Sequence, residues 1–232
     1  MLFTGFTEKT IKFLFEIGYN NNREWYEEHK PDYKKNVLRP FQDLVADLGE
    51  KMKNIDPEFE LRPAVDKTIS RIYRDTRFSK DKTPYRNNVW ISFKKAVPDW
   101  KETPVYFFEI YPEYYHFGMG FFNYPSNLKE KLREAILKDP AAFKKAIFFY
   151  GKKGPASQFE IAGEVFKRVK DKDVPEDLRK WYERKGFYLY CRKNLDDLVF
   201  GPGLVEFLYK NFLTIKPLYD YLWDVIRQPK LT

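Results

Sequence analysis

Basic residues gather in one short stretch of the sequence, between Lys67 and Lys95. Nine lysines and arginines fall there and only Asp75 and Asp81 oppose them, so this stretch carries most of the formal net charge of +8. A local excess of positive charge focuses the electrostatic potential and attracts anions. The stretch therefore predicts an anion-binding surface, centred on residues 71–86.

The residue types of this stretch suit a phosphate or carboxylate ligand. Guanidinium groups present forks of donors that match pairs of oxygens, and lysines add mobile point charges. An aspartate between arginines would orient them. We expect the site to be formed by Arg71, Arg74, Asp75, Arg77, Lys80, Lys82, Tyr85, Arg86 and, from a later strand, His116. If the site carries out a reaction, Tyr85 or His116 would supply the polar or acid–base group.

Three hypotheses for this stretch stay open. In the first, it binds a phosphorylated or carboxylated small molecule, such as a nucleotide, in an enzyme or a sensor. In the second it binds nucleic acid, with phosphates on the basic surface and bases stacked on Tyr73, Phe78 and Trp90. In the third the cations are internally paired, for example with Glu109, and the protein is a structural or partner-binding domain.

The same stretch carries a recognisable motif, Arg71-x-x-Arg74-Asp75-x-Arg77-Phe78-Ser79-Lys80-Asp81-Lys82-x-Pro84-Tyr85. It resembles the signature of a bacterial and fungal family known only as a conserved domain of unknown function. An asparagine-rich turn at residues 20–26 and a glycine-containing strand at residues 118–125 are similar to that family too. The likeness runs from about Phe3 to Leu222 and is weakest between Tyr150 and Asp177. The resemblance implies a family and no ligand or activity.

Other residue types limit the possible chemistry. The sequence holds one cysteine and two histidines, too few for a structural zinc site of cysteine and histidine alone, and no metal-binding motif is present. We expect no metal and no cofactor. Cys191 alternates with aromatic residues and is expected to be buried and inert. Asn20, Asn21 and Asn22 are expected to cap the following helix rather than to bind a ligand.

The first block, residues 1–62, is predicted to be helical. One helix should span about Thr7–Gly18, and a second should follow Asn22 with Trp25 and Tyr26 as its apolar anchors. A third is indicated from about Pro40 to Lys53 by apolar residues at spacings of three and four. Pro31, Pro40 and Pro57 should mark boundaries between the helices of this block.

The second block, residues 64–123, is predicted to be a β-meander. Its expected strands are Lys67–Tyr73, Tyr85–Phe93, Val105–Tyr111 and Tyr114–Phe122. Only Pro112 and Glu113 join the last two, which forces an antiparallel pair. Gly118 and Gly120 should allow another group to approach closely.

The third block, residues 124–232, is predicted to be mixed and mainly helical. Helices should run from Pro125 to Lys138 and from Pro140 to Tyr150, with a loop at 151–155 and a strand at Phe187–Cys191. Two closing helices should follow Pro202 and Thr214. The whole chain is then expected to form a single α+β domain, with the antiparallel meander packed against N-terminal and C-terminal helices.

Length and composition fit a folded protein without a membrane partner. A chain of 232 residues should bury roughly 70% of the surface it exposes when unfolded. No run reaches the roughly 18 apolar residues that span a bilayer. The charged N-terminal stretch does not have the pattern of a signal peptide. We expect a cytoplasmic protein, and the sequence leaves its oligomeric state open.

Overall fold

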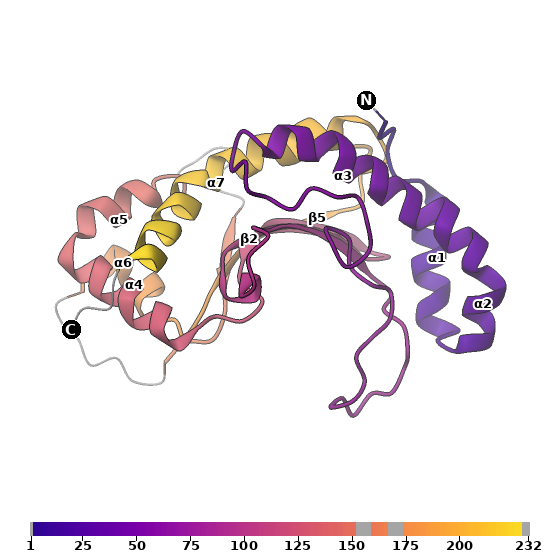
Figure 1. Cartoon of the computed structure of the whole chain (residues 1–232), viewed down its shortest axis with the longest axis horizontal. Helices are drawn as coiled ribbons and strands as arrows, with labels where there is room; N and C mark the ends of the chain where they lie inside the picture. Colours follow the sequence, from indigo (N-terminus) through magenta and orange to yellow (C-terminus); the bar gives the residue numbers. More distant parts are fainter. Residues whose placement is uncertain (1, 152–158, 167–173, 229–232) are drawn as a thin grey trace. The chain divides into compact units, whose positions relative to one another are not determined.

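The computed structural model describes residues 2–151, 159–166 and 174–228 of the chain and shows an α+β fold (Figure 1). Its antiparallel sheet has the order β1-β2-β3-β5-β4. The strands are β1 (Val89–Phe93), β2 (Val105–Ile110), β3 (Tyr114–Gly120), β4 (Glu160–Ala162) and β5 (Tyr188–Asn194). The predicted fold class is confirmed.

Helices precede, interrupt and follow the strands along the chain. The N-terminal elements are α1 (Glu8–Tyr19), α2 (Arg23–Asp32), the π-helical segment η1 (Tyr33–Leu38) and α3 (Arg39–Met52). The later elements are the short 3₁₀ turn η2 (Trp100–Glu102), α4 (Ser126–Lys138), α5 (Pro140–Ala146), α6 (Glu176–Tyr182) and α7 (Gly203–Arg227). Among the described helices, none combines the length and the apolar composition needed to cross a membrane.

The meander order holds for the first three strands only. β1, β2 and β3 are neighbours in the sheet, and the Tyr111 amide donates to the Tyr114 carbonyl across the turn at Pro112 and Glu113. Beyond β3 the order changes, because β5 pairs with β3 and β4 pairs antiparallel with β5, with Ile161 opposite Leu189.

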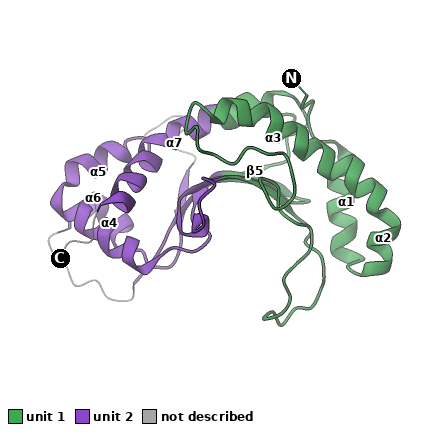
Figure 2. Cartoon of the chain, viewed as in Figure 1, with its two compact units in different colours: residues 1–93, 107–117, 192–209 green, residues 94–106, 118–191, 210–232 purple. Residues whose placement is uncertain are grey.

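The chain divides into two compact units, which Figure 2 colours separately. The first unit contains residues 1–93, 107–117 and 192–209, and the second contains residues 94–106, 118–191 and 210–232. The division falls inside β2, β3, β5 and α7, so both units draw on the same continuous elements.

The first two N-terminal helices begin at polar residues that cap them, and α3 continues from η1 without a side-chain cap. α1 follows Thr7, whose amide donates to Thr10 Oγ1 at 3.2 Å. α2 follows Asn22, whose Oδ1 accepts from the Trp25 amide at 2.9 Å. α3 buries the apolar stripe that predicts it, since Phe41, Leu44, Val45, Leu48 and Met52 are all inaccessible to solvent. The predicted helices and the capping role of Asn22 are confirmed.

Pro31 does not end α2, contrary to the expectation from the sequence. The helix continues to Asp32 and passes into the wider turns of η1, and the Tyr33 amide donates to the His29 and Lys30 carbonyls. A proline removes one helical hydrogen bond, and a π-helical turn is one way to accommodate the loss. Pro40 sits in the first turn of α3, the position in a helix where proline is tolerated.

The predicted strand Lys67–Tyr73 is wrong as a regular element. This segment makes isolated bridges instead of a ladder, from Ile69 to Val65 and to Ile91, and from Tyr73 to Tyr85. The chain turns tightly first, because the amides of residues 67, 68 and 69 all donate to the Ala64 carbonyl. Ser70 then accepts from the Trp90 amide through its Oγ, which replaces a backbone bond of the ladder. For the same reason regular pairing starts at Val89 and not at Tyr85.

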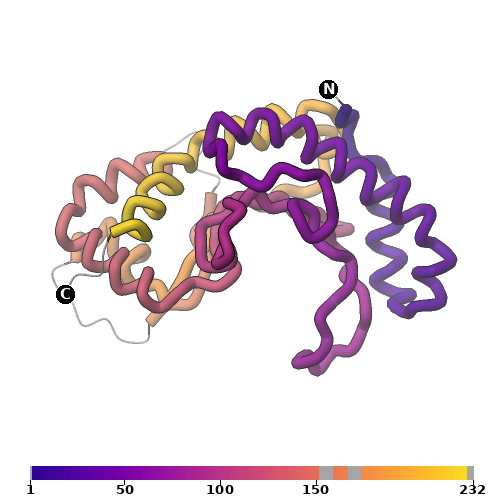
Figure 3. The backbone as a smooth tube through the Cα atoms, in the orientation of Figure 1, coloured from indigo at the N-terminus to yellow at the C-terminus, as the bar shows by residue number. Residues whose placement is uncertain are grey.

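The two predicted closing helices are a single helix. α7 runs unbroken from Gly203 to Arg227, as the continuous tube in Figure 3 shows. Thr214 Oγ1 donates to the Lys210 carbonyl one turn earlier, so it does not cap a new helix. Buried residues at helical spacing, including Leu208, Phe212, Ile215 and Leu218, continue past Pro217, and their burial favours the helical path over a break.

The helices of the third block lie close to their predicted places. α4 matches the prediction, while α5 ends at Ala146 rather than Tyr150. Asp139 caps α5 by accepting from the Ala142 amide at 2.9 Å. Of the predicted loop at 151–155, only Gly151 lies within the described residues. Cys191 in β5 is 3% exposed, which confirms the expected burial.

Two glycines give opposite expectations for stability. We expect Gly118→Ala to lower the free energy of unfolding by roughly 1–3 kcal/mol, because the new Cβ would overlap the backbone of Leu189 in β5. Gly49→Ala, inside α3, should raise it by about 0.5–1 kcal/mol, since the nearest atom to the new Cβ is 3.6 Å away. Urea unfolding followed by circular dichroism measures both. A Gly118→Ala variant as stable as the parent would contradict this packing.

Candidate functional site

Residues 71–86, here called the arm, form a hairpin-like projection from the first unit (Figures 1 and 3). Its two sides are joined by the bridge between Tyr73 and Tyr85. The Arg74 amide donates to the Pro84 carbonyl and the Arg86 amide to the Ile72 carbonyl, both at 2.8 Å. The arm is therefore a paired structure at its base and an open loop at its tip.

Helix α2 holds the base of the arm. The Asn21 side chain donates from Nδ2 to the Tyr85 carbonyl and accepts at Oδ1 from the Tyr85 amide, each at 2.9 Å. The Tyr85 ring stacks on Tyr26 at 4.4 Å between centroids. Burial raises the pKa of Tyr85, and the neighbouring Tyr73 raises it further. Tyr85 is thus an anchor of the arm, and its ring is not exposed to a ligand.

Three of the expected anion-binding arginines are already paired with carboxylates. Arg71 contacts Asp66, and Arg74 contacts both Asp81 and Thr83. Arg77 makes two bonds to Asp75, at 2.7 Å from Nη2 and 3.0 Å from Nε. The partners come from the arm and its base, whereas the sequence suggested Glu109 as the internal partner.

The remaining charges of the basic stretch have different surroundings. Lys82 donates from Nζ to the Thr76 carbonyl at 2.8 Å, which ties the tip of the arm together. Lys80 is exposed at that tip. Lys94 and Lys95 are buried, with their ammonium groups 4.3 and 4.6 Å from the ring centroids of Trp100 and Trp223 respectively. The stretch is therefore not one continuous cationic surface.

Arg86 differs from the other three arginines of the arm because its guanidinium has no hydrogen-bond or ion-pair partner within the described parts of the chain. Its Nε is buried and unbonded, and its guanidinium carbon lies 5.0 Å from the ring centroid of Trp90. A buried polar group without a hydrogen bond is costly, and a charged one more so. Arg86 is therefore the arginine of the arm whose charge no described acidic residue balances.

Arg86 lies beside one face of the sheet, here called the strand face. It is the face formed in the first unit by Asn88, Trp90, Phe107, Glu109, Tyr114, His116 and Arg192. Strand residues alternate between faces, and the intervening residues, such as Ile91, Phe108 and Tyr115, are fully or almost fully buried. α3 packs on that opposite side, where Phe41 meets Phe108 at 6.3 Å. The strand face thus carries the polar and partly exposed residues.

A hydrogen-bonded network lies on the strand face. Asn88 donates from Nδ2 to one oxygen of Glu109, and His116 Nε2 contacts the other. The side chains of His116 and Glu109 are 18% and 15% exposed. Burial raises the pKa of Tyr111, and the nearby Glu109 carboxylate raises it further. A carboxylate that orients an imidazole is an arrangement that can accept or donate a proton.

Aromatic rings surround this network. Phe107, Tyr111 and Tyr114 present their edges or faces to the His116 ring, at centroid distances of 5.3, 5.6 and 6.1 Å. The guanidinium of Arg192 lies over Tyr114 at 3.6 Å from its centroid. The strand face therefore combines cations, an imidazole and aromatic surfaces, the mixture that orients a polar ligand.

The structure thus brings only part of the expected site together. Arg86 and His116 border the same face, while the remaining expected residues lie in the arm and Tyr85 in its base. Sequence reasoning missed Asn88, Tyr114 and Arg192, and it did not pair Glu109 with His116. The pairing could have been found, since a two-residue turn at Pro112 and Glu113 places residue 109 opposite residue 116.

The glycines of β3 serve packing between strands. A Cβ at Gly118 would overlap the Leu189 backbone, and one at Gly120 would crowd the side chain of Tyr188. The predicted close approach is thus made by β5. Within the described residues, no group of three or more histidine, cysteine, aspartate or glutamate side chains could hold a metal ion.

The structure is an α+β fold whose strand face carries an imidazole–carboxylate pair and is bordered by Arg86, which has no ion-pair partner among the described residues. Comparison with protein families shows that the chain belongs to the conserved hypothetical protein family DUF2461, which matches residues 9–221. The match agrees with the resemblance expected from the arm motif. No curated protein matches the chain.

The arginine pairs of the arm predict its behaviour in acid. Arg77 lowers the pKa of Asp75 from 3.8 to about 2, and Arg74 lowers that of Asp81 to about 2. Because these pKa values fall on folding, the pairs stabilise the arm above pH 3.8 and are lost as the pH falls through about 2.

A carboxyl titration by NMR, with Arg74→Gln beside the parent, measures this. In the variant we expect the pKa of Asp81 to rise toward 3.8 while that of Asp75 stays at about 2, as an internal control. An Asp81 that titrates near 3.8 in the parent protein would show that the pair does not persist in solution.

Proposed function

We propose that this protein binds a small anionic molecule, carrying phosphate or carboxylate, at the strand face beside Arg86. The observation that carries the proposal is the guanidinium of Arg86, whose buried Nε finds no partner in the described structure. A bidentate oxyanion would satisfy such a group with charge-assisted hydrogen bonds. The proposed site thus moves from the tip of the arm to its base.

The arm contributes to this site by its charge and its position. Each of its three arginine–aspartate pairs carries no net charge, so these arginines stabilise the shape of the arm and do not bind the anion. Lys80 and Lys82 leave the tip positive, which would raise the concentration of anions nearby. The strand face would then contact the remainder of the ligand through Trp90, Tyr114 and Arg192.

The His116–Glu109 pair extends the proposal from binding to catalysis, because it could transfer a proton to or from the bound ligand. A proton-transfer group on the face that binds an anion is what an enzyme acting on a phosphorylated small molecule or nucleotide requires. Phosphorylated metabolites are concentrated inside cells, so the proposal keeps the cytoplasmic location expected from the sequence.

A nucleic-acid-binding surface is the second candidate, and one observation favours it. Phe78 at the tip of the arm is 95% exposed, with the guanidinium of Arg77 5.9 Å from its ring centroid. The other two expected stacking residues are engaged, because Tyr73 packs on Tyr26 and Tyr85, and Trp90 lies under Arg86. One free ring is a small stacking platform, so the small-molecule site is preferred.

The third hypothesis, a structural or partner-binding domain with internally paired arginines, describes part of the arm. Arg71, Arg74 and Arg77 have internal partners, as that hypothesis requires. Arg86 has none among the residues that the structure describes, and this difference makes the two ideas separable by mutation.

A ligand screen with matched variants tests the binding site. Phosphate, nucleotides and citrate are added to the parent, to Arg86→Gln and to Arg77→Gln, and the melting temperature is followed. We expect ligands to stabilise the parent and Arg77→Gln, while Arg86→Gln binds roughly tenfold or more weakly, because it loses a charged hydrogen bond. Equal stabilisation of both variants would refute a site at Arg86.

Arg86→Gln and Arg74→Gln are expected to differ in stability in the absence of ligand. Arg86→Gln removes an unsatisfied half-buried cation, so we expect it to melt no lower than the parent. Arg74→Gln removes the ion pair to Asp81 and the hydrogen bond to Thr83, although those two residues stay bonded to each other, and it should melt slightly lower. A marked loss of stability in Arg86→Gln alone would favour the structural hypothesis.

Salt dependence separates the nucleic-acid alternative. Binding of a short single strand through Z phosphates should weaken on a log–log plot with a slope of about −0.7Z. If oligonucleotides bind with a steep slope and Phe78→Ala abolishes binding while Arg86→Gln does not, the second candidate replaces the first.

A further inference from the structure

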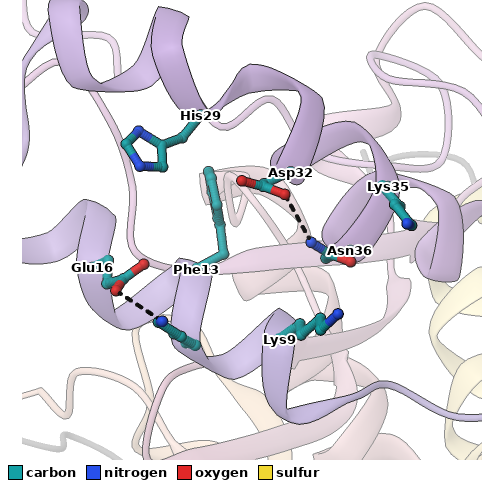
Figure 4. Close-up of a pocket in the computed structure, with 8 residues that line it drawn as sticks. Lys9, Phe13, Glu16, His29, Asp32, Lys35 and Asn36 are labelled. Atoms are coloured by element: carbon teal, nitrogen blue, oxygen red, sulfur yellow. Dashed lines mark hydrogen bonds and ion pairs between the residues drawn. The ribbon is translucent and has the colours of Figure 1, made fainter.

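A cavity lies among the N-terminal helices of the first unit, and none of the residues of the strand face lines it. It has a volume of about 360 Å³ and is bordered by α1, α2 and η1 (Figure 4). Its lining residues are Lys9, Lys12, Phe13, Glu16, His29, Asp32, Lys35 and Asn36. This volume is at the lower end of the range usual for small-molecule sites.

One side of this cavity is apolar and rigid. Phe13 is 3% exposed and packs on Trp25 at 5.6 Å between centroids. The His29 ring stacks on Trp25 at 4.1 Å, nearly parallel. His29 Nδ1 donates to the Trp25 carbonyl at 2.8 Å, and its Nε2 has no partner among the described side chains and backbone. This side thus offers a flat ring with one unused nitrogen.

The opposite side is cationic. Lys9 from α1 and Lys35 from η1 have no ion-pair partner within the described ranges, and Asn36 lies between them in Figure 4. Glu16 pairs with Lys12 at 3.7 Å, whereas Asp32 accepts only from the neutral Asn36 amide at 3.4 Å and keeps its charge. Three lysines against two carboxylates leave the lining with a net charge of +1.

The backbone that presents this cationic side is held in place. Thr10, inaccessible to solvent in α1, donates from Oγ1 to the Asn36 carbonyl at 2.6 Å. Lys35 and Asn36 belong to the π-helical turns of η1, a rare geometry that is often found at functional sites. α1 and η1 are thus fixed against each other with Lys9 and Lys35 on the same cavity.

We propose that this cavity binds a phosphomonoester of small-molecule size. The ammonium groups of Lys9 and Lys35 and the amide of Asn36 would hold the phosphate. The organic part would lie against Phe13 and the His29 ring. A monoester is favoured over free phosphate because the cavity has an apolar side as well as a cationic one.

The two histidines of the chain allow a direct test, because His29 borders this cavity and His116 lies on the strand face. Phenyl phosphate is titrated into the full-length protein while the imidazole resonances are followed by NMR. We expect a saturable shift of the His29 resonances. No shift at His29, or a shift at His116 alone, would overturn the proposal, and a shift at His29 alone would leave the strand-face site without support from this probe.

Variants define the groups that bind. In the double variant Lys9→Gln/Lys35→Gln we expect affinity at His29 to fall at least tenfold. Lys34→Gln, an exposed neighbour in η1 outside the cavity lining, should bind as the parent does. The substituted lysines are all exposed, and unchanged melting temperatures check that each variant folds. Equal affinity in the double variant, or equally tight binding of phenol, would contradict recognition of the phosphate.

Discussion

The attachment of the arm to helix α2 is the interaction on which the proposed strand-face site depends. Asn21 uses both groups of its amide on the backbone of one residue, Tyr85, as a neighbouring strand would. Tyr26 adds a buried stacked ring, and burial raises the pKa of that tyrosine above its ordinary value. A residue that follows Tyr85 directly has little freedom, so Arg86 is directed to the edge of the sheet whatever the tip of the arm does.

This constraint separates two kinds of cation that look alike in the sequence. The exposed side chains of arginines in the loop can rotate toward an aspartate of the same loop and form surface ion pairs. Arg86 is fixed beside Trp90, and no described acid lies within ion-pair distance of it. Position, rather than residue type, decides which cation is left for a ligand. The three paired arginines stabilise the conformation of the arm, and the binding hypothesis rests on Arg86.

Much of the fold follows from local sequence patterns, while the failures occur where distant partners intervene. The helices at α1, α3 and α4 have apolar stripes and start signals that any reader of the sequence can find. The segment 67–73 has the composition of a strand, but the Ser70 side chain replaces a ladder bond, and no local pattern reveals that. Pro217 looks like a helix break, yet burial of its neighbours keeps α7 intact.

The sequence also predicted part of the candidate site and missed the contacts between residues that are distant in the chain. The charge excess located the arm, and alternation in β3 put His116 on a polar face. The ion pairs of the arm depend on side-chain geometry in a loop, which spacing does not determine. Arg192 is about 80 residues from its partner Tyr114, so only the strand order β3-β5 brings the two together.

The division of the chain has a consequence for biosynthesis. The first compact unit takes its last portion from residues 192–209, although most of it comes from the N-terminal half. During translation that unit stays incomplete until residues 192–209 have left the ribosome. Neither unit corresponds to an uninterrupted piece of the gene, so recombination could not exchange one of them as a cassette.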